Sequence, residues 1–158
     1  MKNNFLNKSV ANIYFKPSSN SEVVSQILYG EKFKILFKRK KWIKIKTHYD
    51  NYIGYIKNGN FLKNFNPSFK ISKIKSRIFL KKGKKFLSSN HHLYYGSGVC
   101  IRNENKKYVE FEKNKWIKKI DIKSIDHYEK NYIKIFKSFL NTKYLWGCLL
   151  YTSDAADE

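Results

Sequence analysis

The sequence predicts a mainly β protein, with two tandem small β-barrels followed by one α-helix. Three observations support this fold class. Short runs that alternate large apolar and polar residues, separated by turn residues, fill most of the first 121 residues. The pattern of the first part recurs at an offset of about 65 residues, which indicates a repeat. Beyond Ile122, apolar residues recur at three- and four-residue steps, the period of an α-helix.

The first module is expected to occupy residues 1–66 and to contain five strands. Residues 16–21 combine Pro, Ser and Asn, which favour a turn after the first of these strands. Residues 33–37 and 42–46 flank a basic turn, and the second of them alternates large apolar residues with Lys. Residues 50–56 supply a further turn and strand. Five strands in so short a segment are typical of a small, strongly bent barrel.

The second module is expected at residues 67–121, because it repeats the pattern of the first. Leu28-Tyr29-Gly30 is echoed by Tyr94-Tyr95-Gly96. Trp42 follows the first of these glycines by twelve residues, and Tyr108 follows the second by the same interval. The predicted join is Asn64-Phe65-Asn66-Pro67-Ser68, since Pro and Asn disfavour regular structure.

Residues 122–147 are predicted to contain one helix that ends near Asn141. Ser124 is suited to cap the helix through its hydroxyl, and Asp126 and Glu129 favour its positively charged N-terminal end. The periodic apolar positions are Ile125, Tyr128, Tyr132, Ile135, Phe136 and Phe139.

The net charge of +21 raises the question of a polyanionic partner. Of the 33 basic residues only Arg39, Arg77 and Arg102 are arginines, whereas base readout relies on the bidentate guanidinium. The excess of Lys, Asn, Ile, Tyr and Phe is also what A/T-rich codons produce. We therefore expect a solvated lysine-rich surface and no specific nucleic-acid partner.

Two cysteines, Cys100 and Cys148, provide neither a disulfide framework nor metal-ligand spacing, so no metal and no cofactor are expected. The N-terminal residues lack the apolar core of a signal peptide, and no run approaches the length of a membrane span. The sequence therefore predicts a cytoplasmic monomer without a membrane span, or a periplasmic protein if the true start lies upstream.

Several segments carry a resemblance to a known family. Residues 10–18 and 21–31 look like the opening of a bacterial SH3 domain, and residues 50–56 resemble its Asp-Gly-Tyr-x-Gly-aromatic strand. Residues 139–147 are similar to the Phe-Leu-Gly-Thr-Pro-Tyr-Leu-Trp-Gly-Gly segment that opens a peptidase domain, with Asn and Lys replacing the first Gly and the Pro. The chain thus resembles an NlpC-type, papain-like cell-wall cysteine peptidase with N-terminal bacterial SH3 domains, so both β modules are expected to be SH3-like.

This resemblance implies hydrolysis of a peptidoglycan stem peptide, of the γ-D-glutamyl-L-diamino acid endopeptidase type, by a Cys nucleophile that a His activates. In the family, that Cys lies in an Asp-Cys-Ser-Gly motif beyond the opening segment. Cys148 directly follows Gly147, lacks this motif and has no His after it. We therefore expect no catalytic residue here: the chain is interpreted as an inactive fragment, truncated at the start of the peptidase domain.

Residues 148–158 differ from the rest in composition. Lys, Asn and Ile, abundant in the preceding chain, are missing from this tail, while two of the three alanines occur in it. Read back into codons, the tail looks like a translated sequencing adapter, so it is interpreted as an artefact and excluded from the fold.

Four residues are candidates for binding the muropeptide. The family resemblance implies that the first SH3-like domain recognises the free N-terminus of the stem peptide. Tyr52 is a candidate because it lies in the Asp-x-Tyr-x-Gly segment, and Glu22 is a candidate because its carboxylate can pair with the ammonium group. Tyr144 and Trp146 would line the pocket from the peptidase side. Ordinary roles remain open: Tyr52 as a packing tyrosine, Glu22 as an exposed loop acid, and the aromatic pair as an anchor for the helix end.

A second interpretation is a non-enzymatic tandem module that binds cell-wall glycopeptide or, less favoured, nucleic acid. The distribution of charge distinguishes the two. Lysines spread over both modules fit the hydrolase fragment, whereas lysines gathered with aromatic residues on one face favour the binding module.

Overall fold

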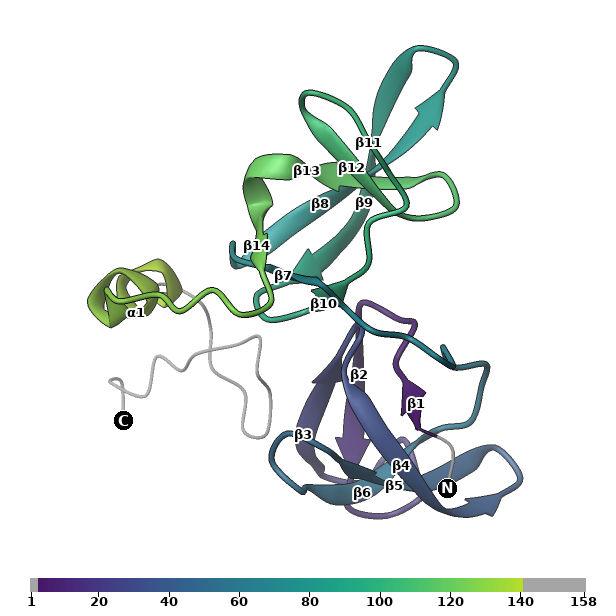
Figure 1. Cartoon of the computed structure of the whole chain (residues 1–158). Coiled ribbons are helices and arrows are strands. Elements are labelled where there is room, and N and C mark those ends of the chain that lie inside the picture. The colour runs from purple at the N-terminus through teal and green to yellow at the C-terminus, as the bar shows by residue number, and fades with distance from the viewer. Residues whose placement is uncertain (1–2, 141–158) are drawn as a thin grey trace.

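The computed structural model describes residues 3–140, which form two groups of antiparallel strands and one helix (Figure 1). Tyr144, Trp146 and the tail therefore lie outside the described residues. The first lobe is a six-stranded sheet in the order β1-β4-β5-β6-β2-β3. Its strands are β1 (Asn4–Phe5), β2 (Val10–Tyr14), β3 (Val23–Leu28), β4 (Lys32–Arg39), β5 (Trp42–Thr47) and β6 (Ile53–Lys57).

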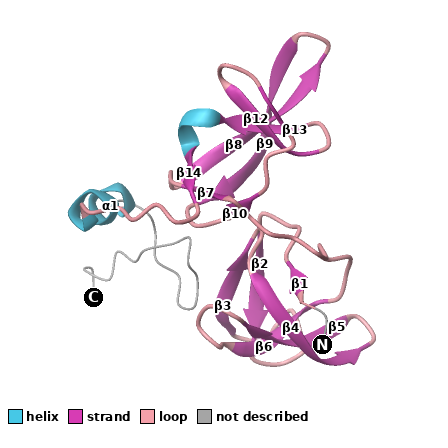
Figure 2. Cartoon of the chain, viewed as in Figure 1, coloured by secondary structure: helices cyan, strands magenta, loops and turns pink. Residues whose placement is uncertain are grey.

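The second lobe contains a three-stranded sheet, β10-β7-β14, and a five-stranded sheet, β11-β12-β13-β8-β9. Its elements are β7 (Phe69–Ile71), β8 (Lys75–Lys82), β9 (Lys85–Tyr94), β10 (Gly98–Val99), β11 (Asn103–Glu104), β12 (Tyr108–Glu112), β13 (Lys115–Lys118), the 3-10 turn η1 (Lys119–Asp121) and β14 (Ile122–Ser124). Strands dominate the chain and α1 (Tyr132–Phe139) is the one α-helix of the described part (Figure 2), which confirms the predicted class.

The sheets are open, so the expected closure into barrels is not found. In the first lobe, β3 pairs on one side only, and the far side of β1 is linked only by the isolated bridge between Phe5 and Leu62. The sheet bends at register shifts between Ile13 and Tyr14 and between Ile35 and Phe37, where one strand carries an extra residue. Bending of this kind curves a sheet around its core without requiring its edge strands to meet.

Each lobe has its own apolar core, built by period-two alternation. Along β5, Ile43 and Ile45 are fully buried, while Lys44 and Lys46 between and beyond them are only half-buried. The core of the first lobe consists of Leu6, Ile13, Ile27, Phe33, Ile43, Ile45 and Ile56. The core of the second consists of Ile71, Ile78, Leu93, Val99, Val109, Phe111 and Ile117, together with Tyr29.

Tyr29 belongs to the first lobe in sequence but packs in the core of the second. Its ring is 2% exposed and contacts Phe111 edge-on, with 5.4 Å between ring centroids. Burial and the neighbouring Glu112 carboxylate, to which the Tyr29 hydroxyl donates a hydrogen bond, raise the pKa of this phenol far above its ordinary value. The lobes are therefore joined through a shared core, and the division at residues 66 and 67 stays a prediction.

The backbones of the lobes also touch. The N–H of Gly98 donates to the carbonyl of Tyr29 at 3.1 Å. A Cβ added to Gly30, whose φ is +76°, would lie 2.1 Å from the carbonyl oxygen of Gly98. Only a residue without a side chain fits this approach.

The helix begins later than the sequence predicts. Ser124 is not its cap, because residues 122–124 form β14 and Ser124 pairs with Phe69 of β7. The cap is Asn131, whose side chain accepts a hydrogen bond from the N–H of Lys134 at 3.1 Å. Pairing with β7 supplies the backbone hydrogen bonds of residues 122–124, which therefore do not need a helix. The helical spacing of apolar residues predicts a helix correctly only after Asn131.

Glu31 provides a test of the region beside the lobe junction. Its carboxylate accepts a hydrogen bond from the N–H of Leu28 at 2.7 Å, but burial outweighs this bond and raises the carboxyl pKa. A raised pKa means that the folded state favours the protonated form. The associated stability is complete below the ordinary pKa of Glu, about 4.3, and is lost as pH rises through the raised pKa.

We therefore expect Glu31→Gln to increase the free energy of unfolding at neutral pH, with a gain that disappears in acid. Urea unfolding at several pH values measures this. Glu110→Gln is the opposite control, because the Asn103 side chain and the N–H of Asn114 lower the pKa of Glu110. It should destabilise at neutral pH. A loss of stability in Glu31→Gln that does not vary with pH would contradict the account.

Candidate functional site

Tyr52 lies in the tight turn between β5 and β6. Its N–H donates to the Thr47 hydroxyl at 2.7 Å, and its carbonyl accepts from the N–H of Thr47 at 2.9 Å. The Thr47 hydroxyl also donates to Asp50, and Asn51 has a positive φ of 58°. These bonds fix the turn while leaving the Tyr52 side chain 41% exposed, so the ring is accessible to a ligand.

Glu22 lies at the entrance to β3 and is exposed. Its carbonyl accepts from the N–H of Phe15 at 3.0 Å. Glu22 and Tyr52 each precede a strand that pairs with Tyr14 of β2, through Val23 and Tyr55 respectively. None of the hydrogen bonds or ion pairs found within residues 3–140 joins Glu22 and Tyr52. Their role in binding stays a prediction.

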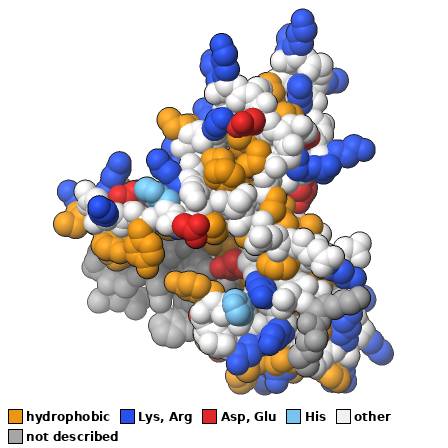
Figure 3. Space-filling model, in the orientation of Figure 1, with side chains coloured by type: hydrophobic (Ala, Val, Ile, Leu, Met, Phe, Trp, Pro, Cys, Tyr) orange, Lys and Arg blue, Asp and Glu red, His pale blue; other side chains and the backbone are white. Residues whose placement is uncertain are grey.

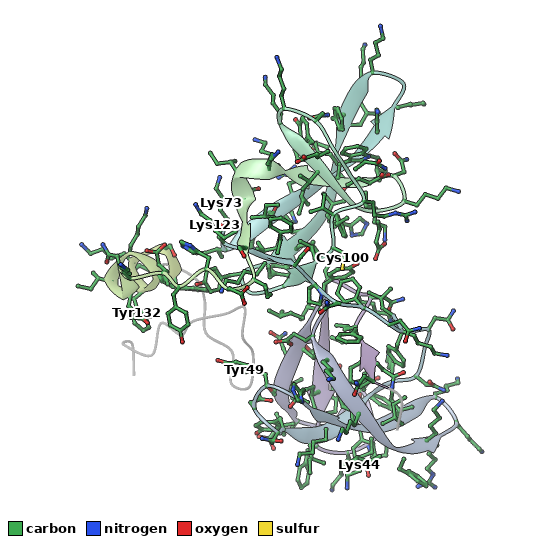
Figure 4. The ribbon with its side chains drawn as sticks, in the orientation of Figure 1. Lys44, Tyr49, Lys73, Cys100, Lys123 and Tyr132 are labelled. Carbon is green, nitrogen blue, oxygen red and sulfur yellow. The ribbon has the colours of Figure 1, made fainter. Side chains whose placement is uncertain are left out.

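Exposed aromatic and apolar residues that the sequence analysis did not single out surround these candidates. Phe15 is 63% exposed and follows β2, while Tyr49 is 92% exposed and lies in the same turn as Tyr52. Tyr49 projects from the side of the first lobe that faces α1 (Figure 4). Both are large aromatic residues outside the alternation of buried and exposed positions along the strands. That departure is the sequence signal that could have identified them.

A cavity of about 190 Å³ lies between the second lobe and α1. Tyr95 forms part of its wall and contacts Phe139 of α1 edge-on, with 5.9 Å between ring centroids. Burial and the charge of Glu129 raise the pKa of the Tyr95 phenol. Lys123 of β14 and Tyr132 of α1 also line this cavity, and both are labelled in Figure 4.

The helix itself is amphipathic and largely uncovered within the described residues. Tyr132, Ile133 and Phe136 are 55%, 67% and 72% exposed. Large apolar side chains of this kind normally lie against another surface. That residues 122–147 start a further domain stays a prediction; Tyr144 and Trp146 lie beyond the described part.

Positive charge is spread over both lobes. Residues 1–66 contain 13 basic and 3 acidic side chains, and residues 67–121 contain 15 and 4. Lys and Arg side chains appear on the visible face of both lobes and of α1, mainly at their outer edges (Figure 3). The excess of positive charge is therefore similar in the two lobes.

Neither a metal nor a thiol site emerges from residues 3–140. Within these residues no group of three or more His, Cys, Asp and Glu side chains is close enough to hold a metal ion. The Cys100 thiol donates to the Asn66 carbonyl at 3.1 Å, and burial raises its pKa, which disfavours the reactive thiolate. No helix in this part of the chain is long and apolar enough to cross a membrane.

Comparison with known proteins agrees with this geometry. Residues 9–61, which make up most of the first lobe, match the family model of the bacterial SH3 domain. The whole described fold is similar to the crystal structure of an NlpC/P60 family protein from Bacillus cereus ATCC 10987, with a TM-score of 0.73 and 15% sequence identity. The likeness covers 92% of this chain and 66% of that one. No curated protein sequence matches the chain.

The structural neighbour shows that this chain shares the fold of part of an NlpC/P60 family protein, which is the fold that the sequence resemblance implied. Because the chain spans 66% of its neighbour, the activity of a complete protein is a separate question.

Proposed function

We propose that the chain is the N-terminal part of a peptidoglycan stem-peptide hydrolase of the γ-D-glutamyl-L-diamino acid endopeptidase type. The observation that carries the proposal is the fold shared with an NlpC/P60 family protein over 92% of the chain. In this proposal the SH3-like lobes position the muropeptide, and α1 is the first helix of the catalytic domain. The protein acts as a monomer in the cytoplasm, on muropeptides taken up for recycling.

The first lobe offers suitable chemistry for the amine end of a stem peptide. The Glu22 carboxylate is exposed and forms no ion pair with any residue of the described chain. An ammonium group would give it a charge-assisted hydrogen bond. The Tyr52 ring, exposed in the turn that precedes β6, supplies an apolar surface and a hydroxyl.

Glu22→Gln is expected to weaken binding of a stem tripeptide with a free N-terminal amine by about fivefold, the effect of losing roughly 1 kcal/mol from an exposed ion pair. Titration followed by amide NMR shifts measures the affinity of the full chain. Asp126→Asn is the matched control, since it removes one exposed negative charge from the segment before α1. Equal weakening by both variants would mean that net charge, and not this site, controls binding.

The proposal also makes a genomic prediction that separates it from the non-enzymatic tandem module. Resequencing the source DNA beyond the codon for Gly147 should give a frame that continues into an Asp-Cys-Ser-Gly motif, with a His further on. If Cys148 to Glu158 and a stop codon are genomic, the tandem module becomes the better interpretation.

A further inference from the structure

The β8–β9 hairpin projects from the second lobe and carries a dense group of lysines at its tip. β13 pairs with β8 at Phe79 and Leu80, whereas β8 and β9 continue to pair out to Lys82 and Lys85. The tip therefore extends past the sheet, at the end of the second lobe remote from the first lobe (Figure 1). Its residues Lys81, Lys82, Gly83, Lys84 and Lys85 are all exposed.

A second turn supports this tip. The side-chain oxygen of Asn114, between β12 and β13, accepts a hydrogen bond from the N–H of Lys81 at 2.9 Å. Lys113 precedes Asn114 in the same turn and is exposed. A surface hollow of about 530 Å³ lies between the two turns and β11, and Lys81, Asn103, Asn105 and Asn114 line it. Figure 3 shows lysines at these turns on the outer end of the lobe.

Lys81 interacts with the Glu110 carboxylate and lies over the Trp116 ring, with 5.3 Å from its Nζ to the ring centroid, whereas the other tip lysines form no ion pair within the described residues. Within residues 3–140 the lysines that form ion pairs are Lys73, Lys115 and Lys119, none of which belongs to the tip. Two carboxylates also line the hollow, but both are engaged. Glu104 pairs with Lys119, and Glu110 accepts hydrogen bonds from Asn103 and from the N–H of Asn114. Grouped like charges of this kind raise the local concentration of an anionic partner.

The chemistry of the surface restricts the kind of anion. Proteins that hold single-stranded nucleic acid stack bases on exposed aromatic rings. Here Phe86 is stacked on Tyr108 with 4.2 Å between centroids, and Trp116 is only 6% exposed, so neither ring is open to a base. Lysine suits phosphate oxygens as a point charge, and the carboxamides that line the hollow suit hydroxyl groups.

We propose that the tip of the β8–β9 hairpin, with the hollow beside it, binds a linear polyol phosphate, a polymer of hydroxylated units joined by phosphodiesters and lacking bases. Phosphates contact the tip lysines, while hydroxyl groups of the polyol face the carboxamide side chains. The proposal does not depend on the hydrolase function, because it concerns binding by the second lobe alone.

The test uses the full chain and a poly(glycerol phosphate) of defined length, with affinity measured over a series of salt concentrations. Replacing Lys82, Lys84 and Lys85 together by Gln should lower the affinity at low salt by about tenfold or more and reduce the slope of log K against log salt by about 2. The matched control replaces Lys38, Lys40 and Lys41, at the β4–β5 tip of the first lobe, and should leave both quantities nearly unchanged.

Two results would overturn the proposal. Equal losses in the two triple variants would show that total charge controls binding, and no loss in either would exclude the tip. A single-stranded DNA of equal charge serves as the comparison polymer. If it binds as tightly as the polyol phosphate, with the same dependence on the tip lysines, the proposed partner class is wrong. All six substituted lysines are exposed, and circular dichroism verifies that the variants fold.

Discussion

Replacing Gly30 by alanine is expected to destabilise the protein by about 2–4 kcal/mol. The new Cβ would lie 2.1 Å from the carbonyl oxygen of Gly98, so the backbones of the two lobes must separate. Overpacking costs about 1–3 kcal/mol, and the φ of +76° adds about 1 kcal/mol for a residue with a Cβ. Urea unfolding of the full chain measures the change in the free energy of unfolding.

Gly96→Ala is the matched control for this prediction. Gly96 has a similar φ of +87°, but a Cβ added there meets no atom within 4 Å. It should therefore cost about 1 kcal/mol, from backbone strain alone. If the two variants lose equal stability, the close approach of Gly30 to Gly98 contributes nothing.

Tyr29→Ala is expected to have an even larger effect, about 3–5 kcal/mol, because it removes a fully packed aromatic side chain from the core of the second lobe. It should also uncouple the lobes. The first lobe would unfold separately from the second, since the ring that they share is gone.

Tryptophan fluorescence can follow each lobe separately, because Trp42 lies in β5 and Trp116 in β13. With Trp146 replaced by Phe, one variant keeps only Trp42 and another keeps only Trp116. Their urea transitions should coincide with Tyr29 present and separate in Tyr29→Ala. Tyr29→Phe, which loses only the hydrogen bond to Glu112, should cost about 1 kcal/mol and keep the transitions together. Coincident transitions in Tyr29→Ala would contradict the shared core.

The repeat recognised in the sequence has a structural counterpart at its two Tyr-Gly corners. The N–H of Gly30 donates to Leu6, and the N–H of Gly96 donates to Ile71, at 2.8 and 2.9 Å. Tyr29 packs into the element that follows its lobe, and Tyr95 likewise contacts Phe139 of α1. The repeat was visible in the residues, but the docking role of its tyrosines was not, because Tyr29 and Phe111 are far apart in sequence.

Sequence patterns within a few residues predicted the strands and their buried faces, but not the features that depend on distant residues. The alternation of Ile43 and Ile45 with lysines identified β5 and its buried face. The start of the helix was predicted wrongly, because Ser124 is held in β14 by pairing with a strand more than fifty residues earlier. Closure of the sheets into barrels was also wrong, since it depends on whether edge strands meet and not on strand number.

The candidate sites also divide into residues that short motifs identify and residues that only the folded structure brings together. Tyr52 and Glu22 were identified from motifs, and both side chains are exposed, but their binding role stays a prediction. The hollow beside the β8–β9 tip was not foreseen, because Lys81 and Asn114 meet only after the sheet forms. Turn residues from distant segments carry no common pattern in the sequence.

The central claim, that the first lobe recognises the amine end of a stem peptide, is tested most directly by titrating the full chain with two peptides that differ only at that amine. One is a stem tripeptide with a free N-terminus and the other its N-acetylated form. We predict that the free peptide shifts the amide signals of Glu22, Tyr52 and their strand neighbours, and that acetylation abolishes these shifts. Equal binding of the two peptides, or shifts confined to the second lobe, would contradict the account.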